Sequence, residues 1–274
     1  HGAYPRGMRQ CLVLRVFTRG DVGGNHLGVV TDLTGLTGAA MQQIAADLGF
    51  SETIFIDQRE GAVPAVRIFT PATELPFAGH PLVGAAWVLG ALEPGAATGM
   101  RCGIGEVAFR ADGDRAAVDL PLQADVDPEP EAAGLAAEAG LPTPGAGWWA
   151  RMPIPYLVLQ YDDPQTVAGA EPDPDGLASG RSAEATYLVA PDGPGRIKAR
   201  FFAPGLGVFE DPATGSAAAA LAAVRMAGGE EAGSLVIHQG DEIGYPSTIE
   251  LSWSPGMCRL GGAVRRDGVR ELGR

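Results

Sequence analysis

One segment of the chain occurs twice, and this repeat restricts the fold more than any other feature of the sequence. The run RFFAP at 200–204 echoes RIFTP at 67–71, with a constant offset of 133 residues. Each copy is followed by a turn that contains glycine and by an Ala-rich stretch. A strand, turn and helix that recur in this way predict two similarly built halves. Two helix N-termini are then expected to face one another across a cleft and to form an anion site.

The length of the chain agrees with two such halves. A chain of 274 residues suits one large or two similar domains, and the repeat favours two. The run at 121–130 is rich in Pro, Asp and Glu and marks the expected boundary. We predict a mixed α/β (α+β) fold with an N-terminal repeat domain at 8–120 and a C-terminal repeat domain at 121–255. Each is expected to be a curved sheet around a central helix, with 256–274 as the proposed completion of the first domain.

Hydrophobic spacing predicts the individual elements. Helices are expected at 37–48, with Gly49 as the stop, and at 131–139. Strands are expected at 11–18, at Val29 and Val30, and at 53–56, 63–69, 156–161, 186–190, 196–202, 234–240 and 247–253. The remaining predictions are a hairpin of 101–110 and 115–120, a loop at 171–180 and a last element at 258–264. We interpret residues 1–7 as an added segment.

Composition and charge exclude several classes of protein. A chain with 46% apolar and 19% charged residues is typical of globular proteins. The net charge of −13 argues against nucleic-acid or anionic-membrane partners, and no apolar run is long enough for a membrane span. Cys11, Cys102 and Cys258 are far apart and lack C-x-x-C spacing. We therefore expect a reduced, cytoplasmic setting in which all three are packing residues.

The second copy of the repeat carries a candidate binding turn. In EDPATGSAAAALAAVRM, Asp211 precedes Pro212, which we expect at the first helical position. Thr214, Gly215 and Ser216 then lead into the small-residue run. The exposed N–H groups and the positive dipole end of such a helix favour a carboxylate ligand. The alternative is a helix start that only caps.

The first copy continues as ELPFAGHPLVGAAWVLG and carries the second turn. The offset of 133 places Ala78 opposite Asp211, and sets Gly79 and His80 opposite Pro212 and Ala213. His80 can donate a hydrogen bond to a substrate carboxylate or polarise a developing enolate. A histidine that only caps the helix has the same pattern.

Glu52 is the candidate for proton transfer. It lies between a predicted helix end and an apolar strand, where burial can raise the pKa of its carboxyl toward neutrality. Asp211 can share the proton or fix its location. The alternative is that Glu52 is a solvated turn residue.

Other chemistries lack their motifs. His26, His80 and His238 show no metal-ligand spacing, so no metal is expected. GIGEVAF at 103–109 lacks the third glycine of a dinucleotide loop, and GxxxxGK[ST] is absent, so no nucleotide cofactor is expected. Ser216 is not in a G-x-S-x-G elbow, which argues against a serine hydrolase.

Four motifs together resemble the PhzF phenazine-biosynthesis family, whose fold is similar to that of diaminopimelate epimerase. They are SETIF, RIFTPATELPFAGHP, EDPATGSA and IHQGDEIGYPS, at 51–55, 67–81, 210–217 and 237–247. The resemblance implies isomerisation by proton transfer without a cofactor, as with trans-2,3-dihydro-3-hydroxyanthranilate. It also implies that Glu52 is the general acid and base, that His80 binds substrate, that Asp211 is the acidic partner and that Ser216 is the turn serine.

Two departures from the family pattern affect the expected substrate. GNP reads Gly24, Asn25, His26 here, and GRPS near the end reads GYPS with Tyr245. Relatives of the diaminopimelate epimerase type use two thiols at the paired turns. Those positions read Ala78 and Asp211 here, which excludes a two-thiol racemase.

We therefore predict a cofactor-independent isomerase of a small amino or cyclic carboxylate in bacterial secondary metabolism, in an antibiotic pathway. The substrate is expected to be of dihydroanthranilate or unsaturated-proline type. The alternatives are an amino-acid epimerase of the same fold and a catalytically silent binding or scaffold protein. We expect a homodimer with neither nucleic-acid nor membrane partners. The predicted catalytic residues are Glu52, His80 and Asp211, and the predicted substrate-binding residues are Gly79, His80, Asp211, Thr214, Gly215 and Ser216.

Overall fold

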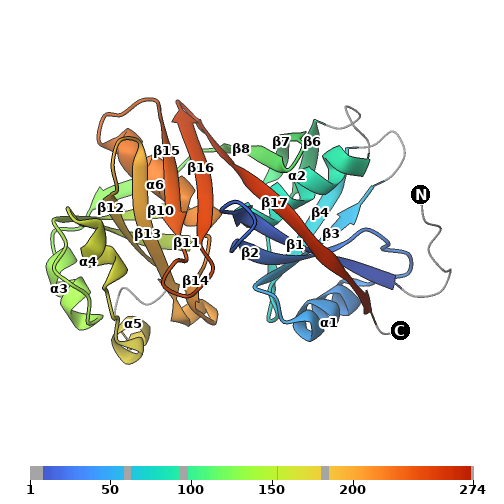
Figure 1. The fold of residues 1–274 in the computed structure, drawn as a ribbon, viewed down its shortest axis with the longest axis horizontal. Helices are drawn as coiled ribbons and strands as arrows, with labels where there is room; N and C mark the ends of the chain where they lie inside the picture. The colour runs from blue at the N-terminus through green and yellow to red at the C-terminus, as the bar shows by residue number, and fades with distance from the viewer. Residues whose placement is uncertain (1–8, 59–62, 93–97, 153, 180–184, 273–274) are drawn as a thin grey trace. The chain divides into compact units, whose positions relative to one another are not determined.

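The computed structural model describes residues 9–58, 63–92, 98–152, 154–179 and 185–272 (Figure 1). The proposed added segment at 1–7 lies outside the described residues. The chain divides into two compact units. The first comprises His1–Val16, His26–Val118 and Val264–Arg274, and the second comprises Phe17–Asn25 and Asp119–Ala263. The segment Phe17–Asn25 therefore belongs to the second unit although it lies early in the chain.

The described residues of the first unit form mainly strands, with two helices. In chain order its elements are β1 (Arg9–Thr18), β2 (Asn25–Val30), α1 (Gly38–Leu48), β3 (Glu52–Asp57), β4 (Ala65–Phe69), β5 (Glu74–Leu75), α2 (Gly79–Leu92), β6 (Gly99–Cys102), β7 (Gly105–Asp112), β8 (Arg115–Pro121) and, at the end, β17 (Met257–Leu272). Of these strands, β1, β2, β8 and β17 cross the boundary, because 17–18, Asn25, 119–121 and 257–263 belong to the second unit. Strand β3 pairs in parallel with β2 and antiparallel with β4.

Helix α2 packs against β3 and β7 and is buried on nearly all sides. A helix in such a place is apolar around its whole circumference, as the sequence of α2 is. Gly84 lets the helix approach the sheet closely, because a Cβ at this position would lie 2.3 Å from the side chain of Leu27 in β2. This close packing brings the first turn of α2 to the edge of β3.

The second unit is also built from strands and helices. Its elements are β9 (Asp125–Pro128), α3 (Ala132–Glu138), β10 (Ala146–Met152), β11 (Ile154–Gln160), α4 (Pro164–Ala168), α5 (Pro174–Ser179), β12 (Thr186–Pro191), β13 (Arg196–Ala203), the 3-10 turn η1 (Pro204–Leu206), β14 (Val208–Asp211), α6 (Gly215–Ala227), β15 (Gly233–Gln239) and β16 (Ser247–Ser254). Helix α6 packs against β9, β10, β11 and β16 (Figure 1). Its Ala-rich run is buried, and small side chains allow strands to lie close to it.

The repeat predicted from the sequence is present in the strand registers. Thr53 pairs with Phe69 in the first unit, and Thr186 pairs with Phe202 in the second, both at the offset of 133. The side chains repeat as well. Arg67 binds Glu74 and lies over the ring of Phe69, whereas Arg200 binds Glu210 and lies over the ring of Phe202.

The offset between the two copies of the repeat changes after β13, so the predicted alignment of the two turns is wrong. Phe69 pairs with Glu74, but Phe202 pairs with Glu210, so the offset becomes 136. The two helices also begin 136 residues apart, at Gly79 and Gly215. The three extra residues are accommodated by a bulge in β13 and by η1. Leu75, not Ala78, therefore corresponds to Asp211, and His80 corresponds to Ser216.

Predictions of where an element begins and ends were confirmed for α1 and were wrong for α6 and for 101–110. Thr37 caps α1, and Gly49 ends it in the left-handed conformation. Pro212 was predicted to begin α6, but the helix begins at Gly215 with Thr214 as its N-cap. The predicted single strand at 101–110 is two strands, β6 and β7, joined by a turn at 103–104.

Two further differences concern the second unit. The predicted loop at 171–180 contains α5, which begins at Pro174 after an Asp173 carboxylate that accepts a hydrogen bond from the N–H of Asp175. Strand β10 had no counterpart in the prediction. Among the described residues, no helix has the length and apolar character to cross a membrane.

Candidate active site

Glu52 is the first residue of β3 and lies opposite Leu27 of the parallel strand β2. Its side chain is 18% exposed. Burial raises the pKa of this carboxyl to about 7, and a hydrogen bond from Ser51 opposes the rise. Within the described parts of the chain, the Oε2 atom of Glu52 has no hydrogen-bond partner. A carboxyl with a near-neutral pKa and an uncommitted oxygen can both accept and return a proton.

His80 lies beside this carboxyl. It is the second residue of α2 and is 4% exposed. The Nε2 atom of His80 lies 3.5 Å from the Oε2 atom of Glu52. The contact follows from the fold, since α2 packs on β3. The first unit thus brings a weakly acidic carboxyl and an imidazole together, and Gly79 lies one residue before the imidazole at the helix start.

Asp211 is the last residue of β14 and is held by a buried hydrogen-bond network. Its Oδ1 atom accepts from Asn25 Nδ2 at 2.9 Å, and its Oδ2 atom accepts from Thr214 Oγ1 at 2.5 Å. Gln239 Nε2 donates to the Asp211 carbonyl at 2.7 Å and to Thr214 Oγ1 at 3.0 Å. Both oxygens of the carboxylate are therefore occupied as acceptors, an arrangement that fixes the turn.

The same network leaves the start of α6 without a side-chain cap. Thr214 is the N-cap residue, but its hydroxyl is turned to Asp211 and makes no capping hydrogen bond. A helix N-terminus presents its first backbone N–H groups to an anion, and in α6 these begin with the N–H groups of Gly215 and Ser216. Ser216 itself is half-buried.

Sequence reasoning did not select Asn25 and Gln239 as site residues. Asn25 lies in the Gly24–His26 segment and Gln239 in IHQGDEIGYPS, so both were within quoted motifs, but their partner is far away in the chain. Gly240 follows Gln239 with a φ of +82°, and a Cβ there would lie 2.7 Å from the carbonyl oxygen of Pro212. Only glycine fits this approach, which holds Gln239 against the 211–214 turn.

The predicted site residues thus form two groups. Glu52, Gly79 and His80 lie in the first unit, and the 211–216 turn lies in the second. Each group is assembled within its own unit. The expectation that the two helix starts face one another stays a prediction.

The cysteines do not belong to either group. Cys11, Cys102 and Cys258 are free and buried, and burial raises the pKa of each thiol, to about 11 for Cys11 and about 12 for Cys258. Among the described residues, no cluster of three or more His, Cys, Asp or Glu side chains has an arrangement that could hold a metal ion.

Known proteins resemble this chain along most of its length. The sequence model of the family described as phenazine biosynthesis-like protein (PhzC-PhzF) matches residues 14–262. An uncharacterised isomerase of Mesorhizobium japonicum is 35% identical over 89% of this chain and 90% of its own. The trans-2,3-dihydro-3-hydroxyanthranilate isomerase of Pseudomonas fluorescens is 34% identical over 88% of this chain and 89% of its own.

Solved structures share the fold. A phenazine biosynthesis protein of the PhzF family from Enterococcus faecalis superposes with a TM-score of 0.81 at 23% identity, covering 98% of this chain and all of that one. A predicted epimerase from Pseudomonas aeruginosa superposes with a TM-score of 0.78 at 28% identity, covering 97% of this chain and 99% of that one. The mixed helix and strand fold is therefore that of PhzF and epimerase-like proteins.

Proposed function

Since the chain belongs to the phenazine biosynthesis-like (PhzC-PhzF) family and is an isomerase, we propose that it moves a proton between carbon atoms of a small carboxylate, with Glu52 as acid and base. The observation that carries the proposal is the pair of Glu52 and His80. The carboxyl has a pKa of about 7 and lies 3.5 Å from the imidazole.

The proposed reaction needs only one proton carrier. Ionised Glu52 takes a proton from one carbon atom, the substrate spreads the electron pair over its conjugated system, and the same carboxyl returns the proton to another carbon. Atoms and charge balance over the cycle. His80 stabilises the charge on the substrate by donating a hydrogen bond while the proton is on Glu52. General acid and base catalysis of this kind contributes roughly 10²- to 10⁴-fold to the rate.

We assign carboxylate binding to the start of α6. The hydroxyl of Thr214 is occupied by Asp211, which leaves the N–H groups of Gly215 and Ser216 for an anion. Charge-assisted hydrogen bonds of this kind contribute about 1.5 to 3 kcal/mol each. Asp211 acts in this proposal as the acceptor that fixes the turn. Gly79 and His80 are assigned a similar binding role at the start of α2.

The first candidate substrate is trans-2,3-dihydro-3-hydroxyanthranilate, because it is the substrate in the name of the Pseudomonas fluorescens relative. An unsaturated proline-type acid is the second candidate. Tyr245 departs from the family pattern, so the ring substituents that the enzyme accepts are expected to differ. We place the reaction in secondary metabolism, without a cofactor or metal.

The test is incubation with each candidate acid in D2O. We expect the absorbance of the conjugated system to change as its double bonds move, and mass spectrometry to show deuterium on carbon to the extent that the proton on Glu52 exchanges with solvent before it is returned. The Glu52→Gln variant should show neither change. An absorbance change that persists in this variant at the wild-type rate would disprove the role of Glu52.

A second candidate function is epimerisation, favoured by the similarity to the predicted epimerase of Pseudomonas aeruginosa. An epimerase also incorporates deuterium at carbon, but it leaves the double bonds in place and inverts one centre. Chiral chromatography of the product separates the two reactions, since inversion with unchanged absorbance identifies an epimerase.

A further inference from the structure

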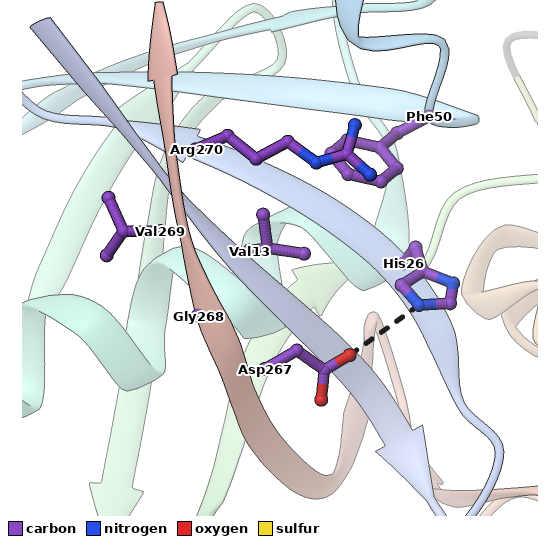
Figure 2. A pocket seen from close by; sticks show the side chains of 7 residues that line it. All are labelled: Val13, His26, Phe50, Asp267, Gly268, Val269 and Arg270. Atoms are coloured by element: carbon purple, nitrogen blue, oxygen red, sulfur yellow. Dashed lines mark ion pairs between the residues drawn. The ribbon is translucent and has the colours of Figure 1, made fainter.

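One pocket of the first unit has no role in the proposed reaction. It has a volume of about 390 Å³ and is shown in Figure 2; it is lined by Val13, His26, Phe50, Asp267, Gly268, Val269 and Arg270. The last four residues belong to β17, which pairs with β1. Pockets of small ligands commonly enclose about 300 to 1,000 Å³, so the size fits a small molecule. None of the lining residues is a proposed catalytic or substrate-binding residue.

Aromatic and apolar groups form one side of this pocket. The rings of His26 and Phe50 are nearly parallel, with an angle of 9° and centroids 6.0 Å apart. The guanidinium of Arg270 lies over the Phe50 ring, 4.6 Å from its centroid. The buried side chain of Val13 is drawn between Arg270 and Asp267 (Figure 2). A flat ring finds both aromatic and aliphatic contacts here.

The charges in the pocket leave one cation in excess. Arg15 Nε donates to both oxygens of Asp267 at 2.9 Å, and His26 Nε2 lies 3.6 Å from the same carboxylate. The charge of Asp267 is therefore balanced by Arg15. Arg270 has no carboxylate within ion-pair distance among the described residues, and it donates a long hydrogen bond of 3.5 Å to the Leu48 carbonyl. A guanidinium with unused donors binds carboxylates in a bidentate way.

We propose that this pocket is a binding site for a small carboxylate that bears a flat ring. The carboxylate pairs with Arg270, and the ring packs on Val13 between Arg270 and the side chain of His26. The balanced Asp267 lies at the other end of the pocket (Figure 2). The family pattern has proline at the position of His26. In the proposed site the imidazole of His26 supplies a flat ring for stacking, which proline does not. The proposal does not depend on the reaction proposed for Glu52.

Benzoate is a suitable probe, and the imidazole of His26 reports on the pocket. In ¹⁵N-labelled protein the His26 signals are identified by their loss in His26→Asn. We expect benzoate to shift them saturably in the wild-type protein. Benzamide has the same ring without the charge, and acetate has the charge without the ring. Both should bind at least tenfold more weakly than benzoate.

Three variants locate the binding. Arg270→Met keeps most of the aliphatic stem and removes the charge, and should weaken benzoate binding at least tenfold. Arg266→Met removes a charge from an exposed residue of the same strand that does not line the pocket, and should leave binding unchanged. Gly268→Trp adds bulk where a new Cβ meets nothing within 4 Å, and should abolish binding.

The results decide the proposal in either direction. Equal affinity for benzoate and benzamide, or undiminished binding by Arg270→Met, overturns it. If Arg270→Met does not fold, Gly268→Trp and the comparison of the three probes decide. If benzoate leaves the His26 signals unmoved while Arg270→Met, unlike Arg266→Met, changes the sedimentation of the protein, the pocket is an interface between copies of the chain and the proposal is wrong.

Discussion

The Nε2 atom of His80 lies 3.5 Å from the Oε2 atom of Glu52, where the first residue of β3 meets the first turn of α2. The two residues are brought together by the packing of a helix on a strand, and not by their spacing in the chain. Burial raises the pKa of the Glu52 carboxyl, while the neighbouring imidazole can donate a hydrogen bond to charge that develops on a substrate.

Replacement of Glu52 by glutamine should abolish proton transfer and leave the fold intact. Glutamine has nearly the same size but cannot carry the proton, so turnover should fall by about 100-fold or more. Glu74→Gln is the matched control, because Glu74 forms a half-exposed ion pair with Arg67. Turnover of both variants should be measured with the true substrate. Near-normal turnover of Glu52→Gln would remove Glu52 from the mechanism.

The rate should rise with pH through about 7. The first step needs the ionised carboxylate, and burial holds the pKa of Glu52 at about 7, so the fraction of competent enzyme increases across that value. The measurement is kcat/KM between pH 5 and 9, with circular dichroism at each pH as the control for unfolding. A rate that decreases as the pH passes 7 would show that the protonated carboxyl starts the reaction.

Stability should change with pH in the opposite sense. The pKa of Glu52 is raised from 4.5 to about 7 in the folded protein. Below pH 4.5 both folded and unfolded chains carry the proton. Between pH 4.5 and 7 the unfolded chain releases it first, so the free energy of unfolding falls, by up to about 3 kcal/mol. The free energy of unfolding of Glu52→Gln does not fall in this way, because glutamine does not ionise. In urea titrations its stability relative to wild type should therefore increase from pH 4.5 to 7, and a constant difference would contradict the raised pKa.

Gln239→Leu should destabilise the second unit. Gln239 is fully buried and donates to the Asp211 carbonyl and to the Thr214 hydroxyl. A buried polar group that loses its partner costs about 1 to 3 kcal/mol. Gln43→Leu on the exposed surface of α1 is the control and should change stability by less than about 0.5 kcal/mol. Equal urea midpoints for the two variants would show that the network adds nothing to stability.

Activity should survive exhaustive EDTA treatment and thiol alkylation. Burial raises the pKa of the thiols of Cys11 and Cys258 to about 11 and 12, so the reactive thiolate is scarce at neutral pH. Labelling of the native protein should therefore be slow, and should accelerate in urea. Activity that is lost on chelation and restored by one divalent metal, with the fold intact, would overturn the proposed mechanism.

The sequence predicted those features whose signals are local. Thr37 and Gly49 bound α1 because a cap and a left-handed glycine act within one turn. The raised pKa of Glu52 followed from its place before an apolar strand. The repeat was readable because Arg67 and Arg200 lie in similar short motifs that keep the same register.

Features that depend on distant partners were not predictable. Three extra residues in the region of the β13 bulge and η1 shift the repeat, yet nothing in the two motifs shows where the insertion lies. Asn25 binds Asp211, which is 186 positions away, so no spacing rule could select it. Strand β17 extends far beyond the predicted 258–264, because its second half is charged and exposed and lacks the hydrophobic pattern of a strand.

The duplicated arginine and glutamate pairs differ in their surroundings. The side chains of Arg67 and Glu74 are each 43% exposed, whereas those of Arg200 and Glu210 are 8% and 5% exposed. Arg200 also donates to backbone carbonyls of α4 and the residues after it. Removal of one partner costs about 3 to 5 kcal/mol for a buried pair and about 0 to 1 kcal/mol for an exposed one. Identical duplicated residues are thus expected to differ in their tolerance of change, and random substitutions should be tolerated at 67 and 74 but lost from a library selected for folding at 200 and 210.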